Sequence, residues 1–515
     1  MYIEESYYFW RLAADLIVNH DYEILQMLED KHEVWLEQRI KGKTNVVRLS
    51  HKMFDWSNQL KQDQTVLDEN IKRVLKVVGG RQVHVHNVYI AKYPPVDDWN
   101  EWKDTRSLPG RKKGTVQTFY IDEQSRELEI NQLYRSLQLK EKNFPAPSEF
   151  EMEQMVEYLK QSIRNNHTKK QQQREQVFFY GKPLFTYVLI VINLLLFGWL
   201  EYQGGSTNTY TLIQYGAKYN PAIIDGEWWR IVFSMFLHIG FFHIMLNMLA
   251  LYVLGTAVER MFGSIRFIVI YFIGGIIGGL ASFAFTPNVA AGASGAIYGL
   301  FGALLFFGTV YKTLFFRTIG TNVIIILILN IVFSIMVPQV DNGAHLGGLV
   351  GGFLASSLVH FPNKREVGKQ LVSFLLIIAL TIGLGWYGYN HDSNHYDARL
   401  QADVATNYIQ QNKFQKAIDL TTTALNHTNS EQSSLYFVRG NGYVQLNKYD
   451  LAKEDYLQAI KLDPNFVEAH QNLSVLYYNV EQNETKALEH AKRVLELDSD
   501  NKEMKEFIQS VEENG

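Results

Sequence analysis

Four polar side chains lie within apolar stretches of the sequence, where hydrogen-bonding and ionisable groups are costly to bury. His243 and Asn247 are four residues apart, which puts both on one face of a helix. Ser294 stands in a Gly-Ala-Ser-Gly segment, and His345 begins another apolar stretch. These residue types are the ones that acyl-transfer chemistry requires.

A serine hydroxyl is a weak nucleophile that needs an adjacent base, and imidazole is the usual base at neutral pH. The oxyanion that forms when the hydroxyl attacks a carbonyl needs donors, which an Asn amide, a His ring and a backbone N–H supply. The set therefore predicts a serine hydrolase with Ser294 as nucleophile and His345 as base. Taken singly, each has a plainer interpretation: helix packing for the serine and an interfacial position for the histidine.

Seven apolar stretches must hold these side chains in place. Each is near the roughly 20 residues that cross the apolar core of a bilayer, and several are shorter. A short helix can begin below the membrane surface and carry a polar residue at depth. The stretches are Leu184–Leu200, Phe241–Thr256, Phe267–Phe285, Ala293–Val310, Ile319–Val337, Gly343–His360 and Leu371–Tyr387.

Charged residues are unevenly distributed along the 515 residues of the chain. Residues 183–390 carry 15 Asp, Glu, Lys and Arg side chains, against 55 in residues 1–182. This composition excludes a single soluble globule and predicts a membrane core between two soluble ends. The formal charge of −4 argues against a nucleic-acid partner, and the absence of cysteine from the sequence excludes disulfides and thiolate metal sites. We expect no cofactor and no metal.

The distribution of Lys and Arg predicts the orientation of the membrane core. With residues 1–182 in the cytoplasm, the inner connections hold eleven cations and the outer ones hold only Lys218 and Arg230. Seven spans then place the C-terminal segment outside the cytoplasm, in what we expect to be a bacterial plasma membrane. The inner cations are Lys169, Lys170, Arg174, Lys182, Arg260, Arg266, Lys312, Arg317, Lys364, Arg365 and Lys369.

At these positions the chain resembles the rhomboid family of intramembrane serine proteases. The resemblance covers roughly residues 180–388, and its motifs occur in the family's order. They are Trp229-Arg230, His243-x-x-x-Asn247, Gly255-x-x-x-Glu259-x-x-x-Gly263, Gly292-x-Ser294-Gly295 and Ala344-His345-x-x-Gly348-x-x-x-Gly352.

The resemblance implies a catalytic dyad of Ser294 and His345 without a carboxylate. It implies that Asn247, His243 and the Ser294 backbone N–H form the oxyanion hole. Supporting roles follow for Tyr298, which would stack on the base or simply pack in the core, and for Gly292, Gly295, Gly348, Gly352, Arg230 and Glu259. The seventh span implies a six-plus-one member, and Pro338–Asn342 would be a cap over the site.

The C-terminal segment repeats with a period near 35 residues. Tyr443, Ala452, Tyr456, Ala459 and Pro464 match the tetratricopeptide (TPR) pattern, and weaker copies precede and follow them. Small residues at these positions let paired helices pack closely. We expect three repeats over about 395–500, then a charged capping helix, and a surface for protein or peptide partners. A structural spacer is the alternative.

The N-terminal segment shows both helical and strand patterns. Helices are predicted at Tyr7–Glu29 and Ser148–Asn165. Strands are predicted at Asn45–Ser50, Gln82–Ala91 and Thr115–Asp122, which indicates an α+β domain. His84 and His86 project from one side of a strand and could bind a metal, although exposed strand histidines are the favoured interpretation.

The fold class expected is therefore mainly α: a polytopic membrane helical bundle of seven spans, residues 179–390. An N-terminal soluble α+β domain, 1–178, and a C-terminal TPR α-solenoid, 391–515, flank it. The function expected is an intramembrane serine endopeptidase that cleaves transmembrane protein substrates in the bilayer. The alternative is a membrane-protein adaptor that recruits partners through its end domains; a transporter would need more charged residues along the spans.

Overall fold

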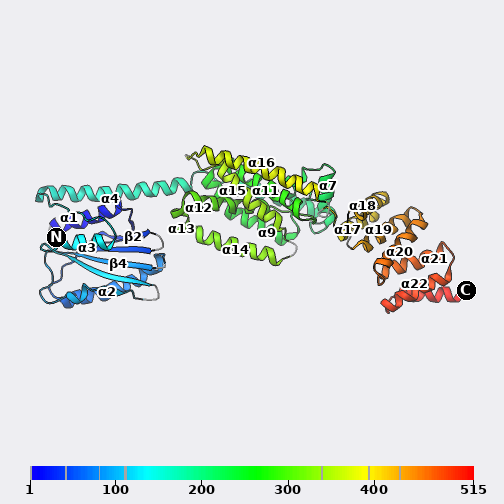
Figure 1. Cartoon of the computed structure of the whole chain (residues 1–515), viewed down its shortest axis with the longest axis horizontal. Helices are drawn as coiled ribbons and strands as arrows, with labels where there is room; N and C mark the ends of the chain where they lie inside the picture. Colours follow the sequence, from blue (N-terminus) through cyan, green and yellow to red (C-terminus); the bar gives the residue numbers. More distant parts are fainter. Residues whose placement is uncertain are drawn as a thin grey trace. The chain divides into compact units, whose positions relative to one another are not determined.

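The computed structural model describes residues 3–40, 43–80, 82–109, 113–337, 340–362, 364–391, 395–428 and 431–514 (Figure 1). Pro338 and Gln339, in the predicted cap, lie outside these ranges. The chain divides into two compact units, Met1–Gln176 and Val177–Gly515. The second unit holds both the apolar helices and the C-terminal repeats.

The first unit is an α+β domain built on one six-stranded sheet, as predicted. The strand order is β1-β2-β3-β4-β6-β5. β3, β4 and β6 pair in parallel, whereas β1, β2 and β3 pair antiparallel, as do β5 and β6. The strands are β1 (Glu23–Leu28), β2 (Glu33–Ile40), β3 (Lys43–Ser50), β4 (Gln82–Ile90), β5 (Arg106–Ser107) and β6 (Lys113–Ile121).

Helices cover both faces of this sheet (Figure 1). On one face, residues of α1 (Ile3–Ala14), α3 (Arg126–Ser136) and α4 (Glu149–Phe178) pack in one core with Val88 and Phe119. On the other face, α2 (Ser57–Val77) packs Leu67 and Ile71 on Val85 and Val116. The apolar residues of the central strands are therefore buried on both sides, which is usual for parallel strands.

One predicted helix of this domain is wrong at its end. The periodicity predicted a helix over Tyr7–Glu29, but α1 passes into a π-helical turn, Asp15–Asn19, and Glu23–Leu28 is strand β1. Asp21 has a positive φ of 55°, which reverses the chain between the two elements. The register of β1 on β2, and not local propensity, decides the structure there.

The apolar helices of the second unit lie close to the seven predicted stretches. They are α5 (Phe185–Tyr202); α9 (Gly240–Ala250) with a π-helical turn (Leu251–Gly255) and α10 (Thr256–Phe262); α11 (Ser264–Phe285); α12 (Ser294–Val310); α14 (Gly320–Met336), preceded by α13 (Lys312–Thr318); α15 (Asn342–Val359); and α16 (Val367–Asn390). Within the described ranges, four of them are long and apolar enough to cross a membrane, or five if α13 and α14, bent by 73°, form one broken span.

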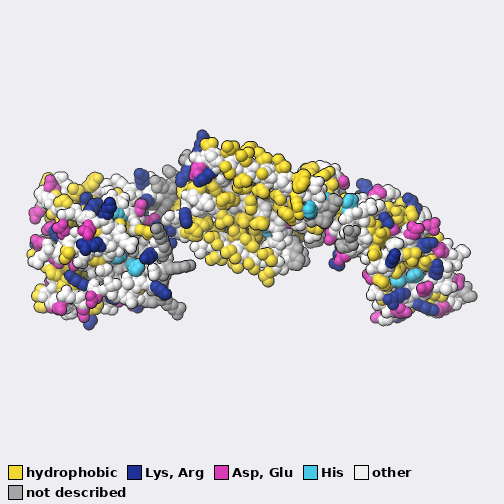
Figure 2. Space-filling model, viewed as in Figure 1, with side chains coloured by type: hydrophobic (Ala, Val, Ile, Leu, Met, Phe, Trp, Pro, Cys, Tyr) yellow, Lys and Arg dark blue, Asp and Glu magenta, His cyan; other side chains and the backbone are white. Residues whose placement is uncertain are grey.

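The two helices that fall short of this length and composition are α12 and α15. They pack side by side against α11 in the middle of the bundle (Figure 1). The remaining helices keep large apolar side chains exposed, such as Leu329, Ile335 and Trp386. Figure 2 shows hydrophobic side chains over most of the visible face of this bundle, as expected of a surface that contacts lipid.

The C-terminal part is an array of antiparallel helix pairs, which confirms the predicted helical repeats. The pairs are α17 (Ala398–Gln410) with α18 (Phe414–His427), α19 (Gln432–Gln445) with α20 (Tyr449–Leu462), and α21 (Val467–Asn479) with α22 (Glu484–Leu497); α23 (Lys502–Asn514) follows. Gly440 permits close packing, because a Cβ there would lie 2.8 Å from the Tyr456 ring.

Candidate active site

Ser294 is the first residue of α12, and the loop before it is fixed by backbone contacts. The N–H of Gly292 donates to the carbonyl of Ser234 at 2.9 Å. The N–H of Ala293 donates to Nε2 of the buried His238 at 3.3 Å. Lys218 and Ala290 form an antiparallel bridge just upstream. Ser294 therefore starts its helix from a rigid loop.

His345 lies in the first turn of α15, a turn that its N-cap residue holds in place. Oδ1 of Asp341 accepts the N–H of Ala344 at 2.8 Å, which satisfies an otherwise unpaired donor of the first turn. The other carboxylate oxygen of Asp341 accepts the Ser282 hydroxyl from α11. The cap thus fixes the start of α15 on the neighbouring helix.

The ring of His345 reaches across to α12. Its Nε2 lies 2.9 Å from Oγ of Ser294, a hydrogen-bond distance, and both side chains are half-buried. This is the separation that a nucleophile and its general base require. The serine and the histidine come from positions 51 residues apart in the sequence.

A third side chain contacts this pair, and sequence reasoning missed it. Oγ of Ser334, from α14, lies 3.1 Å from Nδ1 of His345. Ser334 is 2% exposed and donates to Oδ1 of Asn342 at 2.5 Å. Since Ser334 uses its proton on Asn342, its oxygen is left to accept the N–H of the imidazole. A single serine in an apolar helix carries no spacing signal that would have revealed it.

Tyr298 lies one turn after Ser294 and stacks on the imidazole. The ring centroids of Tyr298 and His345 are 4.1 Å apart and the ring planes differ by 12°. Tyr298 is buried in the core of the helical bundle as well. The arrangement fits both interpretations of this residue, the stacking partner and the packing residue.

His243 and Asn247 lie on α9, and the His243 ring faces the loop that precedes Ser294. A Cβ on Gly292 would fall 2.7 Å from the His243 ring, and the φ of Gly292 is 153°, so only glycine fits there. The buried Asn247 donates through Nδ2 to the carbonyl of His243 at 2.9 Å. The structure thus brings His243 against the serine loop, whereas the described amide contact of Asn247 is within its own helix.

Glycines let α12 and α15 touch backbone to backbone. A Cβ on Gly348 would lie 2.0 Å from the carbonyl oxygen of Gly295, and one on Gly352 would lie 2.1 Å from that of Gly299. No side chain larger than hydrogen fits at these points. This close approach brings the starts of the two helices, and with them Ser294 and His345, within reach of each other.

Arg230 and Glu259 each form hydrogen bonds to backbone groups. Nη1 of Arg230 donates to the carbonyls of Ile213 and Ala217, at 2.6 and 3.1 Å, in the segment between α5 and α9. The carboxylate of Glu259 accepts the backbone N–H groups of residues 184, 185 and 186 at 2.8–3.0 Å, at the start of α5. Both residues contact backbone and neither contacts Ser294 or His345 in the described ranges.

The histidines of the N-terminal domain do not form a metal site in the part of the chain that the structure describes. No group of three or more His, Cys, Asp or Glu side chains could hold an ion there. His86 is buried, contrary to the expectation of an exposed strand histidine, and its Nδ1 lies 3.1 Å from Oγ of Ser136. Burial lowers the pKa of His86 to about 3.

Comparisons with known proteins find two kinds of domain in the chain. A family model described as a Rhomboid domain matches residues 225–363, and a TPR repeat model matches residues 440–480. Over 474 residues the chain is 36% identical to Rhomboid protease GluP of Bacillus subtilis (strain 168), covering 92% of each chain. It is 34% identical over 193 residues to Putative rhomboid protease YdcA of the same organism, covering 37% of this chain and 96% of that relative.

The chain belongs to the rhomboid family. It is accordingly a multi-pass membrane protein and an intramembrane serine protease, as the sequence predicted. One solved structure, the First TPR of Spaghetti (RPAP3) bound to HSP90 peptide SRMEEVD, is similar at 22% identity and a TM-score of 0.22. It covers 23% of this rhomboid chain and 96% of its own.

Proposed function

We propose that Ser294 is the nucleophile and His345 the general base of this protease. Attack of the Ser294 Oγ on a peptide carbonyl carbon transfers the hydroxyl proton to Nε2 of His345. The imidazolium then gives this proton to the leaving amine, and an acyl-enzyme remains that water hydrolyses by the same base. The 2.9 Å separation of the two atoms is the observation that supports this assignment.

The developing oxyanion needs donors in the same place. We assign this role to the backbone N–H of Ser294, the ring of His243 and the side-chain amide of Asn247. The contact between His243 and Gly292 supports the first two, because it puts the ring beside the serine loop. Asn247 would turn its amide from its own helix toward the oxyanion, and a donor that strengthens only in the transition state acts in this way.

The substrate class we propose is a transmembrane protein cut in or near the bilayer. Ser294 is the first residue of α12 and His345 lies in the first turn of α15, so both side chains lie at the ends of apolar helices, which supports cleavage near one membrane face. We further propose three functional parts: a cytoplasmic domain 1–178, the protease domain 179–390, and an outer TPR domain 391–515. The excess of cations on one set of connections supports this orientation.

Cleavage of a single-span model substrate in membranes tests the catalytic assignment. Ser294→Ala and His345→Ala should abolish cleavage, and Asn247→Ala should reduce it by about 10²–10³-fold, the usual cost of one oxyanion donor. Ser373→Ala is a matched control, since Ser373 is a buried, hydrogen-bonded serine of α16. Cleavage by Ser294→Ala at the rate of the unaltered enzyme would refute the proposal.

The orientation has a simple test because the chain contains no cysteine. Glu69→Cys in the N-terminal domain and Glu484→Cys in the repeats each introduce one exposed thiol. A membrane-impermeant maleimide added to intact cells should label the second variant and not the first. Labelling of the first alone would invert the proposed topology.

A second role beside proteolysis is favoured by the repeat array itself, since arrays of this kind offer extended surfaces to protein or peptide partners. The Ser294→Ala protein should then retain partners that a version lacking residues 391–515 loses. If the two proteins retain the same partners, the second role is refuted, and the protease function is unaffected by that result.

A further inference from the structure

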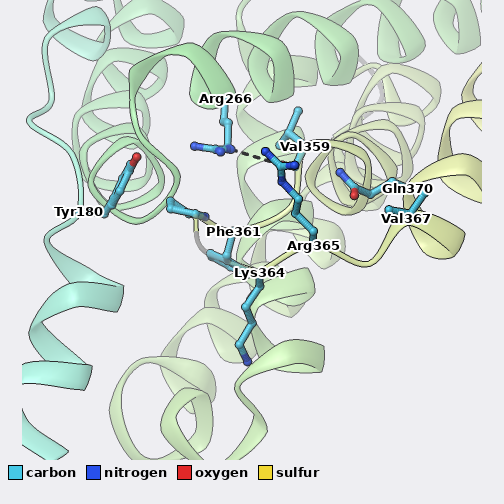
Figure 3. Close-up of a pocket in the computed structure, with 9 residues that line it drawn as sticks. Tyr180, Arg266, Val359, Phe361, Lys364, Arg365, Val367 and Gln370 are labelled. Atoms are coloured by element: carbon cyan, nitrogen blue, oxygen red, sulfur yellow. Dashed lines mark hydrogen bonds between the residues drawn. The ribbon is translucent and has the colours of Figure 1, made fainter. Parts of the chain in front are cut away.

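A hollow lies at the far end of α15 from Ser294 and His345. It has a volume of about 740 Å³ and is lined by the residues drawn in Figure 3. Val359 is 14 positions after His345, which is about 20 Å along the helix at about 1.5 Å per residue. The hollow is thus separate from the protease site.

Three cations and no carboxylate line this hollow. Arg266 comes from the start of α11, and Lys364 and Arg365 come from the connection between α15 and α16. Tyr180 and Gln370 add a hydroxyl and an amide. The remaining lining residues are Val359, Phe361, Pro362 and Val367. A hollow with this lining carries a concentrated positive potential.

Two of the cations are directed at the same space. Figure 3 shows the side chains of Arg266 and Arg365 pointing toward one another, whereas Lys364 points away. Nζ of Lys364 instead lies 4.3 Å from the centre of the Tyr311 ring. Arg266 is held in place by its bonds to the carbonyls of Val359 and Phe262, both at 3.3 Å. These carbonyls neutralise no charge.

The nearest carboxylate in the sequence is engaged elsewhere. Glu366 pairs with Lys369 at 2.5 Å and faces His360 at 3.8 Å, and it does not line the hollow. In the described part of the chain, Arg266 and Arg365 have no acidic partner within ion-pair distance. Two guanidinium groups that face one hollow repel each other, and an anion between them would remove that repulsion.

We propose that this hollow binds the phosphate group of an anionic phospholipid. Guanidinium groups bind phosphate through paired N–H donors, and Tyr180 can donate a further hydrogen bond. The hollow lies where α15 ends and α16 begins, and Tyr180 lies just before α5, so it sits where apolar helices meet the head-group layer. Apolar lining residues such as Val367, 73% exposed, suit the adjoining acyl chain.

The test is lipid retention by the full-length protein, measured by native mass spectrometry after purification from membranes that contain phosphatidylglycerol and phosphatidylcholine. The unaltered protein should keep one phosphatidylglycerol. R266Q/R365Q should lower its occupancy at least tenfold. K182Q/K312Q removes the same number of charges from the inner connections at two exposed lysines that do not line the hollow, and it should keep the lipid.

Two further arms make the outcome decisive. R365Q alone changes a side chain that forms none of the described hydrogen bonds, so its expected loss of at least fivefold in occupancy is not a folding effect. Inorganic phosphate at millimolar concentration should not displace the lipid; displacement would show that the hollow takes soluble phosphate and would overturn the lipid assignment. Equal occupancy in all variants, or equal retention of phosphatidylcholine, would also overturn it.

Discussion

Ser334 and His345 contact each other through Oγ and Nδ1, at 3.1 Å, on the side of the imidazole that faces away from Ser294. Ser334 donates its own proton to Asn342 and so accepts from Nδ1–H. The proton on Nδ1 leaves the lone pair of Nε2 free for the Ser294 hydroxyl. We infer that Ser334 positions His345 and favours the tautomer that the proposed general base needs, a role that a carboxylate fills in other serine enzymes.

Ser334→Ala should lower kcat about fivefold, since one hydrogen bond contributes about 1 kcal/mol. KM should not change, because the bond does not contact substrate. Ser334→Thr keeps the hydroxyl and should restore most of the rate. A rise in KM without a change in kcat would contradict the positioning role. Ser373→Ala serves again as the buried-serine control.

Tyr298 offers a test of the stacked ring. Tyr298→Phe keeps a ring 4.1 Å from the imidazole and should cleave substrate at nearly the normal rate. Tyr298→Leu fills much of the same space without a ring face and should lose about two- to tenfold, since aromatic pairs are worth about 0.5–1.5 kcal/mol. Equal rates in the two variants would leave Tyr298 as a packing residue.

The backbone contact between α12 and α15 predicts that Gly348→Ala is strongly disruptive. Its Cβ would lie 2.0 Å from the Gly295 carbonyl oxygen, so the helices must separate. We expect a loss of about 1–3 kcal/mol or more in stability and little remaining cleavage. Gly383→Ala in α16 is the control, because a Cβ there has no atom within 4 Å. The midpoint of thermal unfolding in detergent compares the two; equal midpoints would contradict the packing argument.

The N-terminal domain contains a buried ion cluster with a predictable pH dependence. Arg48 lies 2.5 Å from Glu33 and 3.3 Å from Asp63. Burial alone would raise the pKa of both carboxyls, but Arg48, together with Lys52 and the hydrogen bonds from Trp35 and Tyr89, outweighs burial and holds each pKa below its ordinary value. The carboxyl groups of the unfolded chain have pKa values of about 4, so the stability that this cluster contributes is fully present above that pH. It is lost as the pH falls through the lower pKa values of the folded state.

Hydrogen exchange of β3 and β4 in the full-length protein measures this effect. Protection should fall as the pH drops below about 4, after correction for the intrinsic exchange rate. Arg48→Gln leaves the buried carboxylate of Glu33 without a cation, whereas Asp63 keeps Lys52, and should cost about 3–5 kcal/mol at neutral pH. Lys72→Gln breaks an exposed pair with Glu69 and should change protection little. Equal protection in the two variants would contradict the buried-cluster account.

The sequence indicated most of the membrane fold because apolar length and charge depletion are strong local signals. It also indicated the candidate site residues, since few polar side chains occur within the apolar stretches. It could not indicate Ser334, whose partner His345 is set by how α14 packs, or the burial of His86, which depends on α3 covering that face of the sheet. The end of the first predicted helix failed for a related reason: strand pairing with β2 overrode a helical pattern.

The glycine contacts of α12 and α15 have a consequence for how the dyad is assembled. Gly295 and Gly299 face Gly348 and Gly352, two pairs that repeat at the same interval of four residues. A slip of four residues, about 6 Å, would leave only one glycine pair in contact and would carry His345 away from Ser294. The two glycine pairs together therefore favour the one alignment of the helices in which both pairs are in contact. The same alignment places the imidazole of His345 on the hydroxyl of Ser294, so the proposed dyad depends on the glycine pairs.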